Sequence, residues 1–162
     1  MKQLLIIRHA KSDKGTGQID FDRPLNERGL KDAPKMAKRL AHKGIIPKQI
    51  VSSPAVRTMS TAVYFAKEFD IKASDILQEK AIYEASANTL LRVINQMDNS
   101  SDFTALVGHN PGLSDLALDL CHGDIQDIPT CGIVLIEFPF DKWAMISKGT
   151  GDLKLFDYPK KE

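Results

Sequence analysis

The sequence predicts an α/β fold, a three-layer α/β/α sandwich with a central, mostly parallel sheet. Two observations support this prediction. Short apolar segments of strand length alternate along the chain with longer segments whose apolar residues have helical spacing, which is typical of βαβ units. The first apolar segment, residues 4–7, contains four large apolar side chains in succession, as expected for a strand that is buried on both faces.

The order of the elements follows from the same patterns. We expect further strands at residues 49–52, 76–83, 103–108, 133–138 and 142–146. We expect helices at residues 27–43, 55–69, 88–97 and 113–121. The last two strands are separated only by a turn at residues 139–141 and are therefore expected to form a hairpin, followed by a mostly polar C-terminal tail.

Two of the helices carry local signals of their own. Asn26 is a good N-cap for the first helix and Gly44 suits its C-terminal end. Pro34 lies between them and lacks the amide hydrogen that a helix interior needs, so we expect this helix to be bent or to start late. In the second helix, the side chains at helical spacing that are expected to face the core are Val56, Met59, Val63 and Ala66.

Length and composition limit the class of protein. A chain of 162 residues is expected to form one domain over residues 1–162. Its formal net charge of +1 gives no electrostatic reason to expect nucleic acid or a membrane as partner. No apolar segment approaches the ~20 residues of a membrane span, and no signal-peptide pattern is present. The two cysteines, Cys121 and Cys131, suggest no disulfide framework, so we expect a cytoplasmic protein with reduced thiols.

Basic and imidazole side chains follow three of the predicted strands. Arg8 and His9 end the first strand, and Arg57 follows the second strand on the first turn of a helix. His109 and Asn110 end the strand at residues 103–108, again at a helix start. The carboxyl ends of parallel strands meet at one edge of a sheet, so these side chains can converge there.

This set of side chains suits an anion. Two guanidinium groups, two imidazoles and the N-termini of helices bring positive charge and N–H donors to one place. None of them has a carboxylate beside it in the sequence. The sequence therefore predicts a pocket of about phosphate size at this edge of the sheet.

The three motifs, in the same order, resemble the signatures of the histidine phosphatase superfamily, which has the phosphoglycerate mutase-like fold. They are Arg8-His9, the Ser53-Pro54 segment that reaches Arg57, and the turn from Val107 to Gly112. The short chain and the His-Asn-Pro-Gly-Leu turn at residues 109–113 are most similar to the SixA branch, the small phosphohistidine phosphatases.

The resemblance implies a mechanism that needs neither a metal ion nor another cofactor. His9 would attack phosphorus and form a phosphohistidine intermediate, while Arg8 and Arg57 hold the phosphoryl oxygens. His109, expected to be protonated, would be a third positive donor. Asn110 is a candidate either for contact with the phosphate or for support of the residues that make it. Glu84, which follows the predicted third strand, lies where many members place an acidic residue and is the candidate general acid.

The substrate expected from the resemblance is phosphohistidine on a partner protein, for example a histidine phosphotransfer domain of a signalling relay. Two alternatives stay open. The protein could hydrolyse small phosphate monoesters, or it could be a catalytically silent module that binds phosphate. A metal site on Asp115, Asp119 and His122, which share helical spacing, is a further reading, but a solvated helix face explains these residues more simply.

Overall fold

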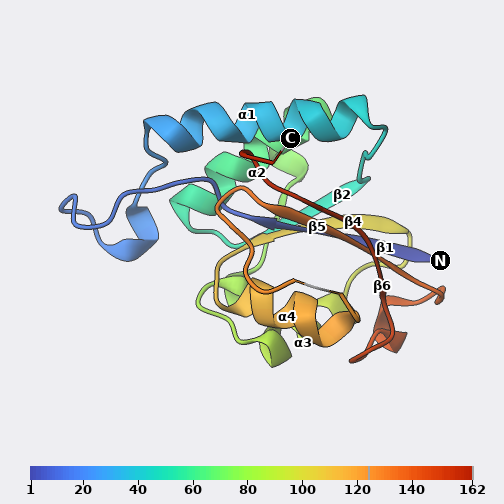
Figure 1. Cartoon of the computed structure of the whole chain (residues 1–162). Coiled ribbons are helices and arrows are strands. Elements are labelled where there is room, and N and C mark those ends of the chain that lie inside the picture. Colours follow the sequence, from blue (N-terminus) through green and yellow to red (C-terminus); the bar gives the residue numbers. More distant parts are fainter. Residues whose placement is uncertain (124, 162) are drawn as a thin grey trace.

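A six-stranded sheet lies between two layers of helices in the computed structural model of the protein, which describes residues 1–123 and 125–161 (Figure 1). The strands are β1 (Lys2–Arg8), β2 (Gln49–Ser52), β3 (Leu77–Gln78), β4 (Phe103–Gly108), β5 (Ile133–Phe138) and β6 (Asp152–Asp157), in the spatial order β3-β2-β4-β1-β5-β6. The first four strands are parallel, and β5 and β6 are antiparallel to their neighbours. The predicted fold class is confirmed.

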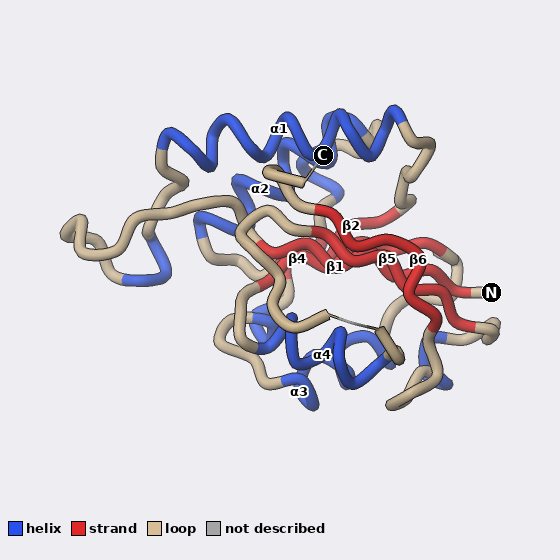
Figure 2. Tube along the Cα trace, in the orientation of Figure 1, coloured by secondary structure: helices blue, strands red, loops and turns tan. Residues whose placement is uncertain are grey.

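The helices are divided between the two faces of the sheet (Figure 2). α1 (Glu27–His42) and α2 (Val56–Glu68) cover one face, and α3 (Ala87–Asn95) and α4 (Gly112–Leu120) cover the other. This division follows from right-handed crossover connections. The chain moves outward from β1 through β2 to β3 and then returns to β4, so the outward and the returning helices lie on opposite faces.

β1, like β2, β4 and β5, contributes side chains to both hydrophobic cores. Leu4 and Ile6 belong to the core under α3 and α4, whereas Leu5 and Ile7 belong to the core under α1 and α2. All four side chains are fully buried. Their unbroken apolar run is therefore explained by helices on both faces of the sheet.

The third strand is shorter than the sequence predicts. Of residues 76–83, only Leu77–Gln78 form β3, at the edge of the sheet, and both residues are exposed. The side chain of Glu79 then accepts a hydrogen bond from the amide of Ala81 and caps the short 3₁₀ helix Lys80–Ile82. This turn brings Ile82 into the core, so Ile82 is buried without being in a strand, whereas Leu77 is in the strand and exposed.

The predicted strand at residues 142–146 is wrong, and so is the predicted hairpin made from it. Residues Trp143–Met145 form a 3₁₀ helix, and Trp143 and Ile146 are both buried on the same side. β5 pairs instead with β6, which lies in the region predicted to be a polar tail. β6 is an edge strand with half-exposed side chains, so its sequence carries too few apolar residues to be recognised.

α1 begins at Glu27 and runs through Pro34 to His42. It therefore does not start late, and Asn26 caps it as predicted by accepting a hydrogen bond from the amide of Gly29.

The predicted buried stripe of α2 is only partly right. Val56 and Val63 are exposed at 36% and 41%, while the buried face includes Arg57, Thr61 and Phe65. Polar residues occupy buried positions on this helix because it faces the site described below.

Both cysteines are buried as free thiols. Within the described parts of the chain, no helix has the length and apolar character needed to cross a membrane.

Candidate active site

The ends of β1, β2 and β4 lie side by side and are joined by backbone hydrogen bonds. The amide of His9 donates to the carbonyl of Gly108 at 3.1 Å, and the amide of Ser53 donates to that of Val107, also at 3.1 Å. These strand ends lie on the left in Figure 1, where the loop of residues 9–26 leaves the sheet. The strand order therefore brings the three predicted motifs together.

A cavity of about 490 Å³ opens at this edge. It is lined by Arg8, His9, Lys11, Ser12, Lys14, Asp20, Arg23, Arg57, Glu84, His109, Asn110 and Thr130. Every candidate site residue taken from the sequence thus lines one cavity.

The ring of His9 is held in a defined tautomer. Its Nδ1 lies 2.8 Å from the carbonyl oxygen of Ala10, which can only accept, so Nδ1 carries the hydrogen and Nε2 bears a lone pair. Nε2 accepts a long hydrogen bond of 3.4 Å from Nε of Arg57. Burial of the ring, assisted by the nearby Arg57 and Arg8, lowers the pKa of His9 to about 4, although the bond to Ala10 opposes this shift. His9 is therefore neutral at neutral pH.

Arg57 is fixed by the loop that follows β1. Its Nη1 donates to the carbonyl oxygen of Asp20 at 2.7 Å, and its Nη2 donates to the Asp20 carboxylate at 3.1 Å. α2 is tied to the end of β1 as well, because the hydroxyl of Thr61 accepts a hydrogen bond from the amide of Ala10 at 3.0 Å.

Asp20 joins three other side chains of the site. Its carboxylate accepts hydrogen bonds from Arg23, from Arg57 and from the Tyr83 hydroxyl, the last at 2.5 Å. The hydroxyl of Tyr83 and then the two guanidinium groups hold the pKa of Asp20 well below its usual range. The same contact with Asp20 raises the pKa of Tyr83 to about 12.

The sequence analysis missed Asp20, Arg23 and Tyr83. Asp20 and Arg23 lie in a polar loop, where no periodicity distinguishes the ion pair of buried Arg23 and half-exposed Asp20 from solvated charges. Arg23 is only 7% exposed, and a single sequence carries no signal for that burial.

His109 contacts the end of β2. Its Nε2 lies 2.8 Å from Oγ of Ser53, and its Nδ1 is buried without a partner in the described structure. Burial, followed by the proximity of His9 and Arg57, lowers the pKa of His109 to about 3. This shift is opposite to the expectation that His109 is protonated, because an imidazolium here is desolvated and lies beside cations.

Arg8 also has a donor without a partner. Its Nη1 donates to the carbonyl oxygen of Ile128 at 2.8 Å, whereas its Nε is buried and unpaired within the described residues. Burial lowers the pKa of Arg8, and Asp127 acts in the opposite direction. Unpaired buried donors are rare in proteins. Arg8 and His109 line the same cavity, which makes the unpaired Nε of Arg8 a candidate donor to an anion.

The side-chain amide of Asn110 forms its hydrogen bonds with other protein groups. Its amide nitrogen donates to Asp127 at 3.1 Å and to the carbonyl of Ile128 at 2.9 Å, and its oxygen accepts from Ser114. These bonds fasten the segment before β5 to the start of α4. Contact between Asn110 and phosphate stays a prediction, and the observed bonds favour a positioning role.

Glu84 is exposed at the rim of the cavity, after the 3₁₀ helix rather than at the end of a strand. Its φ of 56° lies in the left-handed region, which residues other than glycine seldom adopt. Such strain is concentrated at functional sites.

In the described residues, no cluster of three histidine, cysteine or acidic side chains has the arrangement of a metal site. The alternative metal site on Asp115, Asp119 and His122 is therefore not supported.

A mostly parallel α/β sheet with a cationic, imidazole-containing cavity at its carboxyl edge defines an anion-binding α/β protein. Comparison with known proteins identifies the family. Residues 4–97 match the model of the histidine phosphatase superfamily, branch 1, and the chain belongs to that superfamily.

Individual relatives agree with this assignment. An uncharacterised chloroplastic protein of Arabidopsis thaliana is 29% identical over 165 residues, which cover 95% of this chain and 75% of the plant protein. A crystal structure from Agrobacterium tumefaciens, provisionally assigned as the phosphohistidine phosphatase SixA, is 27% identical and superposes with a TM-score of 0.82 over 98% of each chain. The protein histidine phosphatase SixA complexed with tungstate shares the fold, with a TM-score of 0.81, 18% identity and 97% of each chain covered.

Proposed function

We propose that the protein is a phosphatase that forms a phosphohistidine intermediate on Nε2 of His9. The observation that carries the proposal is the state of this imidazole. It is neutral, its hydrogen is on Nδ1 because of the Ala10 carbonyl, and its Nε2 lone pair lies in a cavity with Arg8, Arg57 and His109. A neutral imidazole with a fixed tautomer is prepared for nucleophilic attack.

The reaction then has two steps. The Nε2 lone pair of His9 attacks phosphorus, so that a phosphorus–nitrogen bond forms while the bond to the leaving group breaks and the leaving group takes up a proton. Water next attacks the phosphorus on His9 and the phosphorus–nitrogen bond breaks, so that inorganic phosphate leaves. The proton that water releases replaces the one that the leaving group took from Glu84 or from solvent. Nε2 regains its lone pair and the site is restored.

Three side chains would stabilise the transferring phosphoryl group. Nε of Arg8 and Nδ1 of His109 lack partners in the described structure, and the Arg57 guanidinium contacts the nucleophile directly. Phosphoryl transfer depends mainly on positioning and on charge stabilisation. Removal of one such preorganised donor typically costs on the order of 3 kcal/mol of transition-state stabilisation.

The substrate that we propose is phosphohistidine on a partner protein. The four α-helices of the described structure pack on the two faces of the sheet, and the cavity lies at the edge between them, bordered by the loop of residues 9–26. We infer that a side chain displayed on another protein can enter it. The likeness to structures named SixA supports the same class of substrate.

Small phosphate monoesters are the second candidate, and Glu84 is the observation that favours them. A carboxyl group at the rim of the cavity can protonate an alkoxide leaving group. Phosphohistidine releases an imidazole, which is a better leaving group and needs less assistance.

The test is phosphate release from a histidine phosphotransfer domain that has been phosphorylated chemically with phosphoramidate, with and without a chelator. We expect the wild type to release phosphate in both conditions and to carry an acid-labile, base-stable phosphoryl group when quenched. His9→Ala should do neither, while His42→Ala, at the exposed end of α1, should behave as the wild type.

Two other results would contradict the proposal. Hydrolysis of an aryl phosphate without hydrolysis of the phosphorylated domain would favour the small-ester phosphatase. Binding of inorganic phosphate without turnover of either substrate would identify a silent binding module.

A further inference from the structure

A basic groove leads away from the candidate active site along α1 and the C-terminal residues 155–161. It consists of two adjoining cavities of about 340 Å³ and 600 Å³. The smaller cavity shares Lys11 and Thr130 with the cavity that contains His9. The larger one shares Arg28, Pro159 and Lys160 with the smaller and extends to Lys43, beyond the end of α1. The groove is thus continuous with the site.

The lining of the basic groove is strongly cationic. Seven lysine or arginine side chains line it against two carboxylates, Asp32 and Asp157, in a chain whose formal net charge is only +1. Both carboxylates are already paired, Asp32 with Arg28 at 3.2 Å and Asp157 with Arg39 at 3.1 Å. The positive charge of the protein is therefore concentrated on this surface.

Hydrogen bonds to the C-terminal segment involve only some of these cationic side chains. Arg39 donates to the carbonyl oxygens of Tyr158, Pro159 and Lys161, and Lys35 donates to that of Pro159. Lys160 is exposed, and no hydrogen bond from its side chain is found in the described structure. Nζ of Lys43 lies 3.8 Å from the Asp157 carboxylate, which is a long distance for an ion pair, and the Lys43 side chain is half-exposed. Lys161 donates to the carbonyl oxygen of Phe156 at 2.9 Å. Among the described residues, Lys11, Lys43 and Lys160 are therefore the groove cations that a ligand could engage without breaking a hydrogen bond.

We propose that the basic groove binds an acidic segment of the phosphoprotein substrate, next to the phosphohistidine in the bound complex. This inference rests on the proposed function and names the partner of the same site. Lys11 and Thr130 line both the cavity of His9 and the groove, so a peptide that leaves the cavity past Lys11 enters the groove. Lysine side chains spaced along a groove match carboxylates spaced along a peptide, and such complementarity speeds association and selects the partner.

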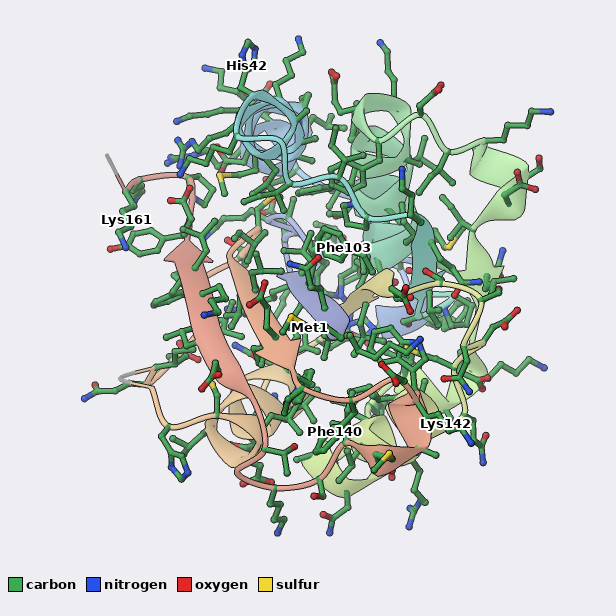
Figure 3. All side chains as sticks on the ribbon, turned by 90° about the vertical axis from the view of Figure 1, so that its right-hand side faces the viewer. Met1, His42, Phe103, Phe140, Lys142 and Lys161 are labelled. Atoms are coloured by element: carbon green, nitrogen blue, oxygen red, sulfur yellow. The ribbon has the colours of Figure 1, made fainter. Side chains whose placement is uncertain are left out.

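Two phosphohistidine peptides of equal length test the proposal, one with glutamate and aspartate beside the phosphohistidine and one with glutamine and asparagine instead. We expect kcat/KM of the wild type to be about tenfold higher for the acidic peptide, mainly through KM, and the difference to shrink at high salt. In the double variant K43E/K160E the ratio should fall to about one. In the control K142E/K148E, whose exposed lysines lie after β5, the ratio should persist. Figure 3 shows Lys142 far from Lys161 and from the end of α1 at His42.

A binding measurement separates the groove from the chemistry. The unphosphorylated peptides, labelled with a fluorophore, are titrated with wild-type protein and followed by anisotropy.

Failure of the wild type to hydrolyse either phosphopeptide would contradict the proposed function, yet tighter binding of the acidic peptide would still support the groove. Equal binding of both peptides, or the same preference in K43E/K160E, would overturn the inference. Tighter binding of a single-stranded oligonucleotide of equal charge would overturn it in favour of a nucleic-acid surface. Thermal unfolding of Lys160→Glu alone checks that the fold is kept.

Discussion

Oγ of Ser53 lies 2.8 Å from Nε2 of His109, so a residue at the end of β2 orients the imidazole that follows β4. The same oxygen accepts a hydrogen bond from the amide of Ala55 at 3.3 Å. If the hydroxyl donates its hydrogen to Nε2, the remaining hydrogen of His109 is on Nδ1, the buried nitrogen that lacks a partner. Ser53 is thereby a positioning residue for a donor to the phosphoryl group.

Ser53→Ala is expected to lower both stability and turnover. The change leaves Nε2 of His109 buried and unpaired, which costs about 1–3 kcal/mol, and it frees the ring to change its tautomer. We expect the free energy of unfolding to fall by that amount, and kcat to fall about tenfold with a smaller change in KM. Ser52→Ala is the matched control, because Ser52 is equally buried but bonds only to the carbonyl of Ser53. Equal kcat values for the two variants would contradict the positioning role.

The stability of the protein should fall as the pH falls from about 6.5 to about 4. In the folded protein the pKa of His9 is lowered to about 4, whereas in the unfolded chain it is near 6.5. Between these values the unfolded state binds more protons, so acid favours unfolding. Urea unfolding at several pH values measures this slope. His9→Gln should reduce it and His42→Gln should not, and an unchanged slope in His9→Gln would show that His9 is not buried in its neutral form.

Asp20→Asn should strengthen the binding of phosphate. The Asp20 carboxylate holds Nη2 of Arg57, a group that a bound phosphate also requires, and its negative charge opposes a second anion. Asparagine keeps an acceptor without the charge, so we expect the Kd of inorganic phosphate to fall about threefold to tenfold. Asp22→Asn, in the same short 3₁₀ helix but outside the cavity lining, is the control. Weaker binding in Asp20→Asn would mean that the charge is needed to position Arg57.

Glu84→Gln should affect esters more than phosphohistidine. Loss of a general acid typically lowers a rate by about 10²-fold or more, and this loss applies where the leaving group must be protonated. We therefore expect kcat on an alkyl phosphate to fall about 10²-fold and kcat on the phosphorylated phosphotransfer domain to fall less than about tenfold. Parallel losses on both substrates would exclude a proton-transfer role and leave Glu84 a structural residue at the rim.

The parts of the fold that the sequence predicts well are those with a strong local pattern. β1 is recognisable because both of its faces are buried, and the three motifs are recognisable because basic groups follow apolar runs. The sequence does not predict β6 because an edge strand needs few apolar residues. It predicts a strand in place of the 3₁₀ helix at Trp143 because a single turn with buried apolar residues has the same short apolar pattern as a strand. The interactions of Asp20 with Arg23, Arg57 and Tyr83 join loop residues that are distant in the sequence, so no local pattern reveals them.

The end of β1 is held from both sides, since the amide of His9 donates to Gly108 and its carbonyl oxygen accepts from the amide of Cys131. The proposed nucleophile is thus fixed directly at the end of β1, whereas Lys11, Asp20 and Arg23 lie further along the loop that follows. Reactivity at His9 nevertheless depends on this loop, because Asp20 holds Arg57, which contacts Nε2 of His9. Exchange of the loop between relatives can therefore redirect the protein to a new substrate only if the incoming loop still supplies a partner for Arg57.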